Sequence, residues 1–413
     1  MVEKMRTPEL IAGMNWRERA VWLLFAATSL QLAFQWPLFR LVPGERTNLF
    51  SALLCFLTLV AAWLVGKKEA RRLKSPEVLV SLALTILALL SSIFSLTPGP
   101  SVFRVFALLA SGLGGFWCAR LLLDDEVKFR WFRNLCLFSL TGILLLSFLG
   151  YLFWGKATRF FDPTIHSFTH IIFLLSFAPL ALLSQPPRGG VLFGLLLLGL
   201  SFLVFCLSRD IYSPLVALGL VFWGAFWGRW RLKYFLLIFL VLLVGLGIFR
   251  HKIPWEKAAR DQESVWYRAE CLPLTLKIAS QHPLFGIGLR SPRVKFLDDY
   301  QMQFPWVKKE KFAEALSRMV TCDNLFLTFL AGLGFPFVII YSVVLLLLYL
   351  RLLFLTYRPP EKSPIPLLAL LLPITAGLLS FLVFDTLLFP QLSWYFHILL
   401  GLIPSAQTRA PER

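Results

Sequence analysis

DNLFLTFLAGLGFPFVIIYSVVLLLLYL, residues 323–350, is an apolar run that follows a polar segment, residues 250–322. About 20 apolar residues in a helix cross the hydrocarbon core of a bilayer. We therefore expect residues 323–350 to span a membrane. Residues 250–322 leave the apolar pattern, so we expect them to form a large loop outside the membrane.

The rest of the chain repeats this apolar character. Of its 413 residues, 58% are hydrophobic and 15% are charged, which is typical of an integral membrane protein. Long apolar runs without alternation favour helices over the strands of a barrel. We predict an all-α membrane protein with about twelve spans, at residues 20–36, 48–66, 78–96, 102–119, 134–154, 166–184, 190–207, 211–228, 234–249, 323–350, 365–384 and 387–404.

The distribution of positive charge predicts the orientation. The net charge is +18, but the Lys and Arg residues gather in alternate turns between spans, with 22 on one side and 6 in the short loops of the other. The positive-inside rule places the richer side, and both termini, in the cytoplasm. This pattern indicates contact with membrane lipid and not with nucleic acid. We predict one membrane domain made of residues 1–249 and 323–413, with residues 250–322 as a periplasmic loop.

Within the large loop, the sequence predicts two helices and an irregular segment. Residues 264–281 have a helical pattern, in which we expect Pro273 to cause a break. Residues 308–319 place apolar side chains on one face and lysines on the other, as a helix packed on protein or lipid does. Between them, Gly286 and Gly288 permit a positive φ and a close approach of other backbone.

Three arginines are candidates for binding a phosphate group. Arg209 lies in a very short turn between two spans, where it can grip a phosphate with two hydrogen bonds; alternatively, it pairs with Asp210 or reaches toward the interface. Arg268 belongs to the first predicted loop helix, and its alternative is a salt bridge or a solvated position. Arg290 follows the two glycines, which by themselves indicate a turn and not a dinucleotide site.

Asp323 and Asn324 are candidates at the start of a span. A carboxylate at this position can act as the general base for an acceptor hydroxyl, although an aspartate exposed to water is a weak base. The alternative is structural, because Asp and Asn are preferred caps at helix N-termini. His166 and His170 begin another span, and packing is the simpler interpretation for both.

No metal or cofactor is predicted. The chain has no acidic cluster and no pair of cysteines or histidines with an acidic partner at a spacing typical of metal ligands. Cys271 and Cys322 both belong to the large loop, where they can form a disulfide or remain two free thiols.

Three motifs resemble the O-antigen ligase and O-antigen polymerase-like proteins of bacterial envelopes over residues 160–340. The first is Ser208-Arg209 at the end of a span. The second is Arg268 followed by Pro283-x-x-Gly286-x-Gly288, and the third is Asp323-Asn324-Leu325-Phe326-Leu327 followed by Gly334. The motifs occur in the family's order and on one side of the membrane.

The resemblance implies a GT-C-like membrane fold and a metal-independent, inverting glycosyltransferase of the bacterial inner membrane. Its donor would be a glycan on undecaprenyl diphosphate, and its acceptor lipid A-core for a ligase or another carrier-linked repeat for a polymerase. Arg209 and Arg268 would neutralise the diphosphate, with help from Arg290. Asp323 would orient or deprotonate the acceptor hydroxyl, and Asn324 would bind substrate beside it.

Departures from the family pattern leave ligase and polymerase open. Ligases usually have His-Asn where this chain has Asp323-Asn324, a tryptophan where it has Leu272, and a second glycine where it has Phe335-Pro336-Phe337. Two other classes are a flippase for lipid-linked sugars and a scaffold without catalysis. A flippase would need basic residues through the depth of the membrane and two matched halves, and the sequence has neither.

Overall fold

The computed structural model of the protein consists of helices and connecting turns in the part of the chain that it describes, where no β-strand occurs. It describes residues 14–41, 45–65, 76–123, 126–154, 255–289, 291, 296–305, 307–319, 322, 324–358, 367–382 and 385–405.

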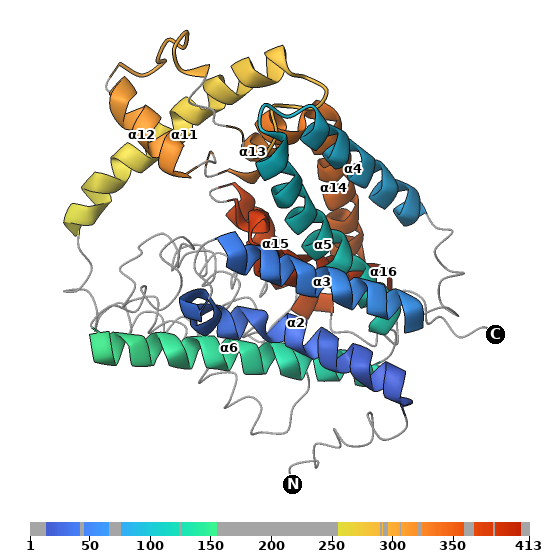
Figure 1. The fold of residues 1–413 in the computed structure, drawn as a ribbon. Coiled ribbons are helices and arrows are strands. Elements are labelled where there is room, and N and C mark those ends of the chain that lie inside the picture. Colours follow the sequence, from blue (N-terminus) through green and yellow to red (C-terminus); the bar gives the residue numbers. More distant parts are fainter. Residues whose placement is uncertain are drawn as a thin grey trace.

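The order of the described helices is shown by the labels in Figure 1. They are α2 (Trp16–Leu41), α3 (Glu45–Val65), α4 (Pro76–Ile93), α5 (Pro98–Leu122), α6 (Glu126–Trp154), α11 (Trp255–Gln281), α12 (Lys309–Met319), α13 (Leu325–Leu333), α14 (Phe335–Tyr357), α15 (Leu367–Phe381), the 3₁₀-helix η5 (Thr386–Leu388) and α16 (Pro390–Ser405).

Four of the described helices are long and apolar enough to cross a membrane: α3 from Asn48 onward, α4, α5 and α14. This confirms a helical membrane protein. In an 18-residue apolar stretch of α5, 78% of the residues are buried inside the protein, against 17–28% in the corresponding stretches of the other three, so those three turn most of their surface outward, as lipid-facing helices do. The predicted spans 166–184, 190–207, 211–228 and 234–249 lie outside the described residues.

The predicted span 323–350 is wrong as a single helix. The chain forms the nine-residue α13 and then α14, which runs on to Tyr357. The two are separated at Gly334, whose φ of 84° lies in the left-handed region and cannot continue a helix. α13 alone is too short to cross a bilayer, and α14 supplies the span.

The expected break at Pro273 is also wrong, because α11 is continuous from Trp255 to Gln281 with Pro273 inside it. The second predicted loop helix is confirmed as α12, which begins at Lys309. Its Phe312 and Leu316 are buried, and Lys309 and Lys311 are exposed, so this helix packs on the protein through its apolar face.

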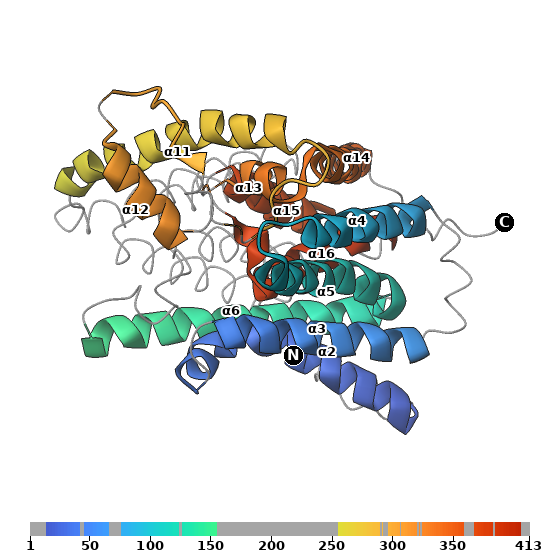
Figure 2. The ribbon, with the colours of Figure 1, turned by 45° about the horizontal axis from the view of Figure 1, so that its top comes forward.

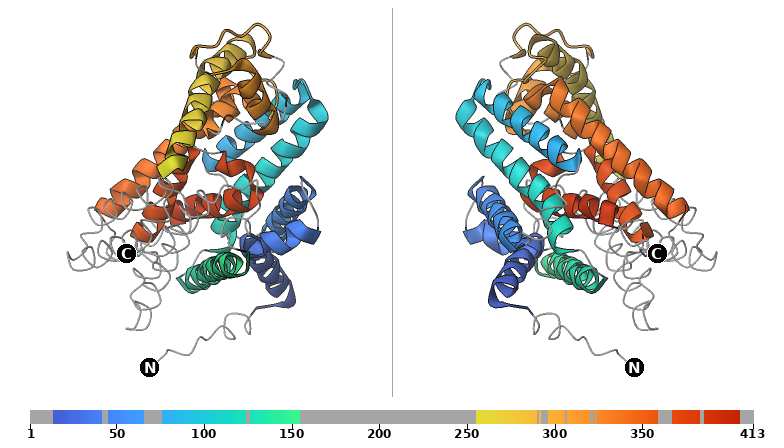
Figure 3. Two further views of the ribbon diagram at one scale, coloured as in Figure 1. Left: turned by 90° about the vertical axis from the view of Figure 1, so that its left-hand side faces the viewer. Right: turned by 90° about the vertical axis from the view of Figure 1, so that its right-hand side faces the viewer.

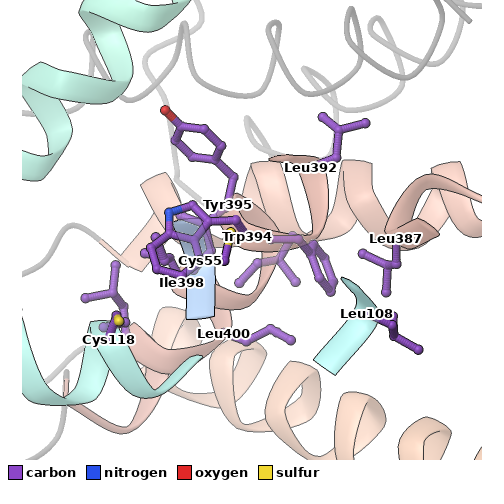
Figure 4. Close-up of a cluster of buried hydrophobic side chains, with 14 of the residues drawn as sticks. Cys55, Leu108, Cys118, Leu387, Leu392, Trp394, Tyr395, Ile398 and Leu400 are labelled. Atoms are coloured by element: carbon purple, nitrogen blue, oxygen red, sulfur yellow. The ribbon is translucent and has the colours of Figure 1, made fainter. Parts of the chain in front are cut away.

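The membrane core is built around α5 and α16, whose backbones lie in contact. A Cβ on Gly115 would come within 2.5 Å of the Trp394 carbonyl oxygen, and one on Gly401 within 2.5 Å of the Phe116 carbonyl oxygen. Small residues permit such contact between membrane helices. Figure 4 shows Trp394, Tyr395 and Ile398 of α16 beside Cys55 of α3, in this buried cluster.

Several buried polar side chains in this core bond from one helix to another. The Gln391 amide donates to Ser51 Oγ at 2.7 Å, which joins α16 to α3, and Trp394 Nε1 donates to Ser29 Oγ at 3.2 Å, which joins α16 to α2. His397 Nδ1 donates to the Ser393 carbonyl at 2.8 Å, so its Nε2 accepts from the Tyr341 hydroxyl at 3.2 Å.

The helices of the loop lie apart from this core. Figure 2 shows α11 on one side of α5 and α16, and α2 and α6 on the other. Figure 3 shows α11 and α12 at one end of the molecule and α2 and α6 at the other. The chain that follows α11 meets the turn between α4 and α5 and the start of α14, through bonds from Leu96 N to the Ile287 carbonyl and from Phe335 N to the Pro283 carbonyl.

Candidate functional site

Residues 283–289, the glycine turn, are held against the end of α13 by backbone hydrogen bonds. Ile287 N donates to the Ala331 carbonyl at 2.8 Å, and Gly288 N donates to the Gly332 carbonyl at 2.9 Å. These carbonyls belong to the last turn of α13, where the helix itself provides no donors. The glycine turn therefore caps α13 through contacts between distant parts of the chain.

Both glycines of the motif are required by this geometry. Gly286 and Gly288 have φ of 62° and 94°, as the sequence predicts. A Cβ on Gly286 would lie 2.6 Å from the Ala331 carbonyl oxygen, and one on Gly288 only 1.9 Å from Ser95 Oγ. The pair forms a structural turn packed between two membrane elements, which agrees with the exclusion of a dinucleotide site.

Serine and threonine hydroxyls fix the other side of the glycine turn to α4 and the residues after it. Ser95 Oγ donates to the Ile287 carbonyl at 3.0 Å and lies 3.0 Å from Ser291 Oγ. Thr97 Oγ1 also lies 3.0 Å from Ser291 Oγ. One turn earlier, Ser91 Oγ donates to the Gly332 carbonyl at 2.8 Å. The glycine turn is thus bonded to α4 and α13 together.

The break between α13 and α14 belongs to the same unit. Phe335 N donates to the Pro283 carbonyl at 2.9 Å, and a Cβ on Gly334 would lie 2.4 Å from the Leu284 carbonyl oxygen. One junction therefore contains Gly286, Gly288 and Gly334. In it, the backbone of the glycine turn contacts the backbone of α13 and of the break between α13 and α14.

Arg268 lies on α11, at the edge of its buried face. Its side chain is half-buried, and its Nε is shielded from solvent. Thr275, two turns along on the same side of the helix, is fully buried and places its hydroxyl 3.3 Å from Cys322 Sγ. Helical spacing predicts that Leu272 shares this inward face with Arg268 and Thr275, but Leu272 is 48% exposed, so the prediction is wrong for this residue. Arg268 therefore lies on the same side of α11 as Thr275, which contacts Cys322, the residue before Asp323.

Asn324 is the N-cap of α13, which confirms the structural interpretation for this residue. Its Oδ1 accepts from Leu327 N at 3.1 Å, and its Nδ2 donates to the Leu382 carbonyl at 3.0 Å. The side chain thereby joins α13 to the end of α15. The oxygen and the nitrogen of the Asn324 amide therefore both bond within the protein. Asn324 directly follows Asp323, the candidate base.

Glu270, which the sequence analysis did not single out, is a fully buried carboxylate on α11. Its oxygens accept from the Tyr300 hydroxyl at 2.7 Å and from Phe304 N at 2.7 Å, which ties residues 296–305 to α11. Burial, together with this carboxylate, raises the pKa of the Tyr300 hydroxyl, so Tyr300 stays protonated and donates. In the sequence, Glu270 is marked only as an acidic residue within an otherwise apolar helix face.

The two cysteines of the loop lie in one buried cluster with Tyr267, Leu274 and Phe312. Cys271 and Cys322 form no disulfide in the structure, and both are fully buried. Of the two alternatives, the structure contains the one with two thiols.

The described residues thus bring Arg268 and Asn324 into one region, through α11, Cys322 and α13. Arg209, Arg290, Asp323, His166 and His170 lie outside the described residues. Within the described ranges, no group of three His, Cys, Asp or Glu side chains could hold a metal ion.

Residues 171–342 match a family model described as O-antigen ligase. The matched segment contains the whole junction of the glycine turn with α13. It also contains the five residues that are candidates for binding or catalysis, Arg209, Arg268, Arg290, Asp323 and Asn324. No curated protein compared with the chain matches it. The match confirms the family resemblance that the three motifs predict.

Proposed function

We propose, from the place of residues 171–342 in the O-antigen ligase-like family of glycan-transferring enzymes, that this protein is a ligase-type glycosyltransferase. It would move a glycan from undecaprenyl diphosphate to lipid A-core or a similar acceptor. The observation that carries the proposal is the coincidence of this match with the junction that joins α11, the glycine turn and α13.

The cationic residues would act on the leaving group. Formation of the new glycosidic bond releases undecaprenyl diphosphate, whose charge must be stabilised in the transition state. Arg268 would hold this diphosphate, and Arg209 and Arg290 would add positive charge. Guanidinium groups suit this role because they bind phosphate oxygens in pairs.

The acceptor would be activated at the start of α13. Asp323 would take the proton of the acceptor hydroxyl as this oxygen attacks the anomeric carbon, which inverts the configuration there. Asn324, as the cap of α13, would fix the backbone beside Asp323. In this proposal its contribution to the site is positional, since its amide is bonded to Leu327 and Leu382.

The membrane topology belongs to the same proposal. Twelve spans with both termini in the cytoplasm of the inner membrane would place residues 250–322 in the periplasm. The positive charge of the alternate turns supports this orientation. The membrane domain would hold the polyprenyl chain, and the loop would cover the diphosphate.

The test is transfer by purified protein in lipid, with a carrier-linked glycan as the donor. Arg268→Ala should lower the rate about 100-fold or more, the usual effect of removing a group that stabilises transition-state charge, and Arg268→Lys should recover part of it. Lys308→Ala, at an exposed position of the same segment, is the matched control. Transfer at the wild-type rate by folded Arg268→Ala would disprove the role of Arg268.

The acceptor decides between ligase and polymerase. In a strain without the gene, the loss of all polymer from lipid A-core, with long carrier-linked chains remaining, indicates a ligase. Single repeats on the core without a ladder indicate a polymerase, the second candidate, which the replacement of His by Asp323 favours. Failure of the carrier-linked sugar to cross the membrane would instead indicate a flippase.

A further inference from the structure

From residue 266 to its end, where its side chains are described, α11 has no charged side chain at an exposed position, and apart from Ser280 and Gln281 these positions are apolar, although the segment around it is highly charged. Between residues 266 and 284, the exposed large side chains are Trp266 (36% exposed), Leu272 (48%), Leu276 (49%) and Leu284 (60%). If this face of α11 were in water, it would be an exposed apolar surface, which marks an interaction site.

The exposed charged side chains described in the segment belong to other elements, among them Glu314 of α12, and Lys277 of α11 turns toward them, because its Nζ donates to the Asp299 carbonyl at 2.8 Å. Asp298, Asp299, Lys309, Glu310 and Lys311 are exposed, and they lie on α12 and on the chain before it. These elements pack on the opposite side of α11, where the rings of Tyr267 and Phe312 lie 5.5 Å apart and Glu270 accepts from Tyr300. The loop thus has an apolar side and a charged side, separated by α11.

The apolar side continues into surfaces that face lipid. On α4, exposed side chains recur at Leu82, Ile86, Leu89 and Ile93, and on α14 at Phe335, Ile339, Val343 and Leu346. This spacing forms one stripe on each helix. Both helices are candidate membrane spans with little of their surface buried in the protein.

Leu284 lies where these stripes meet. Its neighbour Phe285 stacks on Phe94, directly after α4, with 5.0 Å between ring centroids. The residue before it, Pro283, accepts the hydrogen bond from Phe335 N at the start of α14. In Figure 1, α11 ends at this point, and its direction crosses that of α4 and α5.

We infer that residues 266–284 form an interfacial element, which lies on the bilayer that α4 and α14 span. Leu272, Leu276 and Leu284 enter the boundary between head groups and acyl chains, and Trp266 lies at head-group level, where tryptophan is favoured. The occupant of this face is lipid. The inference stands apart from the proposed activity, but it would place Arg268, on the flank of the same helix, at the depth of lipid phosphates.

Spin labels at single cysteines test the depth of this face in the full-length protein in lipid nanodiscs. The labelled variants are Leu272→Cys, Leu276→Cys and Leu284→Cys, with Asp298→Cys and Glu314→Cys as controls on the charged side. Unsubstituted protein, treated with the label, gives the background from native thiols. Collision rates are measured with oxygen, which concentrates in hydrocarbon, and with a nickel chelate, which stays in water.

We expect the ratio of oxygen to nickel collisions to be several-fold higher at residues 272, 276 and 284 than at 298 and 314. A ratio equal to that of the controls would mean that the face is in water and would overturn the inference. Low rates with both reagents would overturn it as well, because the face would then be covered by protein, from this chain or a second copy. Three positions are tested so that one misfolded variant does not decide the result.

Discussion

The contact between α5 and α16 and the contact between the glycine turn and α13 are both close approaches of backbone, but they are stabilised differently. In the first, Gly115 and Gly401 let two long helices touch, and the helices satisfy their own backbone hydrogen bonds. In the second, segments more than 40 residues apart supply each other's missing bonds, as Ile287 and Ala331 do. From this difference we expect the first contact to govern stability and the second to govern how the glycine turn is held against α13.

The largest effect is expected from Gly115→Ala in the membrane core. The added Cβ would lie 2.5 Å from the Trp394 carbonyl oxygen, and backbone cannot move aside without separating α5 from α16. We expect a loss of about 3 kcal/mol, as in overpacked cores, measured as a lower melting temperature in detergent. Gly99→Ala is the control, since a Cβ there meets nothing within 4 Å. Equal melting temperatures for the two variants would contradict the assignment of α5–α16 as the stabilising contact.

Gly288→Ala should affect function more than stability. Its φ of 94° and its closeness to Ser95 would strain the glycine turn by about 2 kcal/mol. We expect a large fall in glycan transfer with a smaller shift in melting temperature than Gly115→Ala gives. Adding Ser95→Gly removes the colliding hydroxyl and should restore part of the transfer. If the double variant is no better than the single one, the collision is not the cause.

Removing the buried carboxylate of Glu270 tests the attachment of residues 296–305. Glu270→Ala leaves Phe304 N without its acceptor, and we expect a loss of about 2 kcal/mol. Glu270→Gln should retain most of the stability, since the amide can accept from Phe304 N and donate to Tyr300. Protease cleavage within residues 296–305 is the measurement, and cleavage of Glu270→Gln as fast as Glu270→Ala would show that charge is required.

The same pair predicts a pH dependence. The raised pKa of Tyr300 means that its bond to Glu270 contributes fully below the ordinary tyrosine pKa, about 10, and is lost as pH rises through the higher folded value. Tyr300→Phe should therefore cost the same stability at pH 7 and pH 9 and progressively less above about pH 10. A cost that already falls between pH 7 and pH 9 would contradict a raised pKa.

The smallest effect is expected from Ser91→Ala, which removes one of the two donors to the Gly332 carbonyl. Because Gly288 N still donates there, we expect a loss of about 1 kcal/mol or less. Ser92→Ala is the control: this serine is equally buried on α4, but its hydroxyl bonds to Ala88 within its own helix. The difference in melting temperature between the two variants measures the bond between α4 and α13.

Features of composition and local geometry were predictable from the sequence. The helical membrane fold follows from long apolar runs, the two positive φ angles from Gly286 and Gly288, and the cap of α13 from the residue type of Asn324. Each of these depends on residues close together in the chain. The family match over residues 171–342 also agrees with the three motifs, which were recognised from the order of residues in the sequence.

Features that depend on distant contacts were not predictable in the same way. The run 323–350 is apolar on both sides of Gly334, where only this glycine and Pro336 mark the break locally, and the bond from Phe335 N to the Pro283 carbonyl comes from a distant part of the chain. Pro273 removes one backbone donor but does not end α11, whose Thr275, Ile278 and other buried side chains hold the helix in place. No local pattern pairs Glu270 with Tyr300, 30 residues later.

The cap on α13 also constrains the order in which the protein can assemble. The carbonyls of Ala331 and Gly332 accept hydrogen bonds from Ile287 N and Gly288 N, which are synthesised more than 40 residues earlier. Ser91, which also donates to the Gly332 carbonyl, is synthesised earlier still. Until α13 emerges, the glycine turn has no partner for these donors, and α11 has no α13 to pack on. The segment that forms the loop must therefore wait for a helix that is made after it. A nascent chain that stops short of residue 331 would contain every helix up to α12 and still lack the junction.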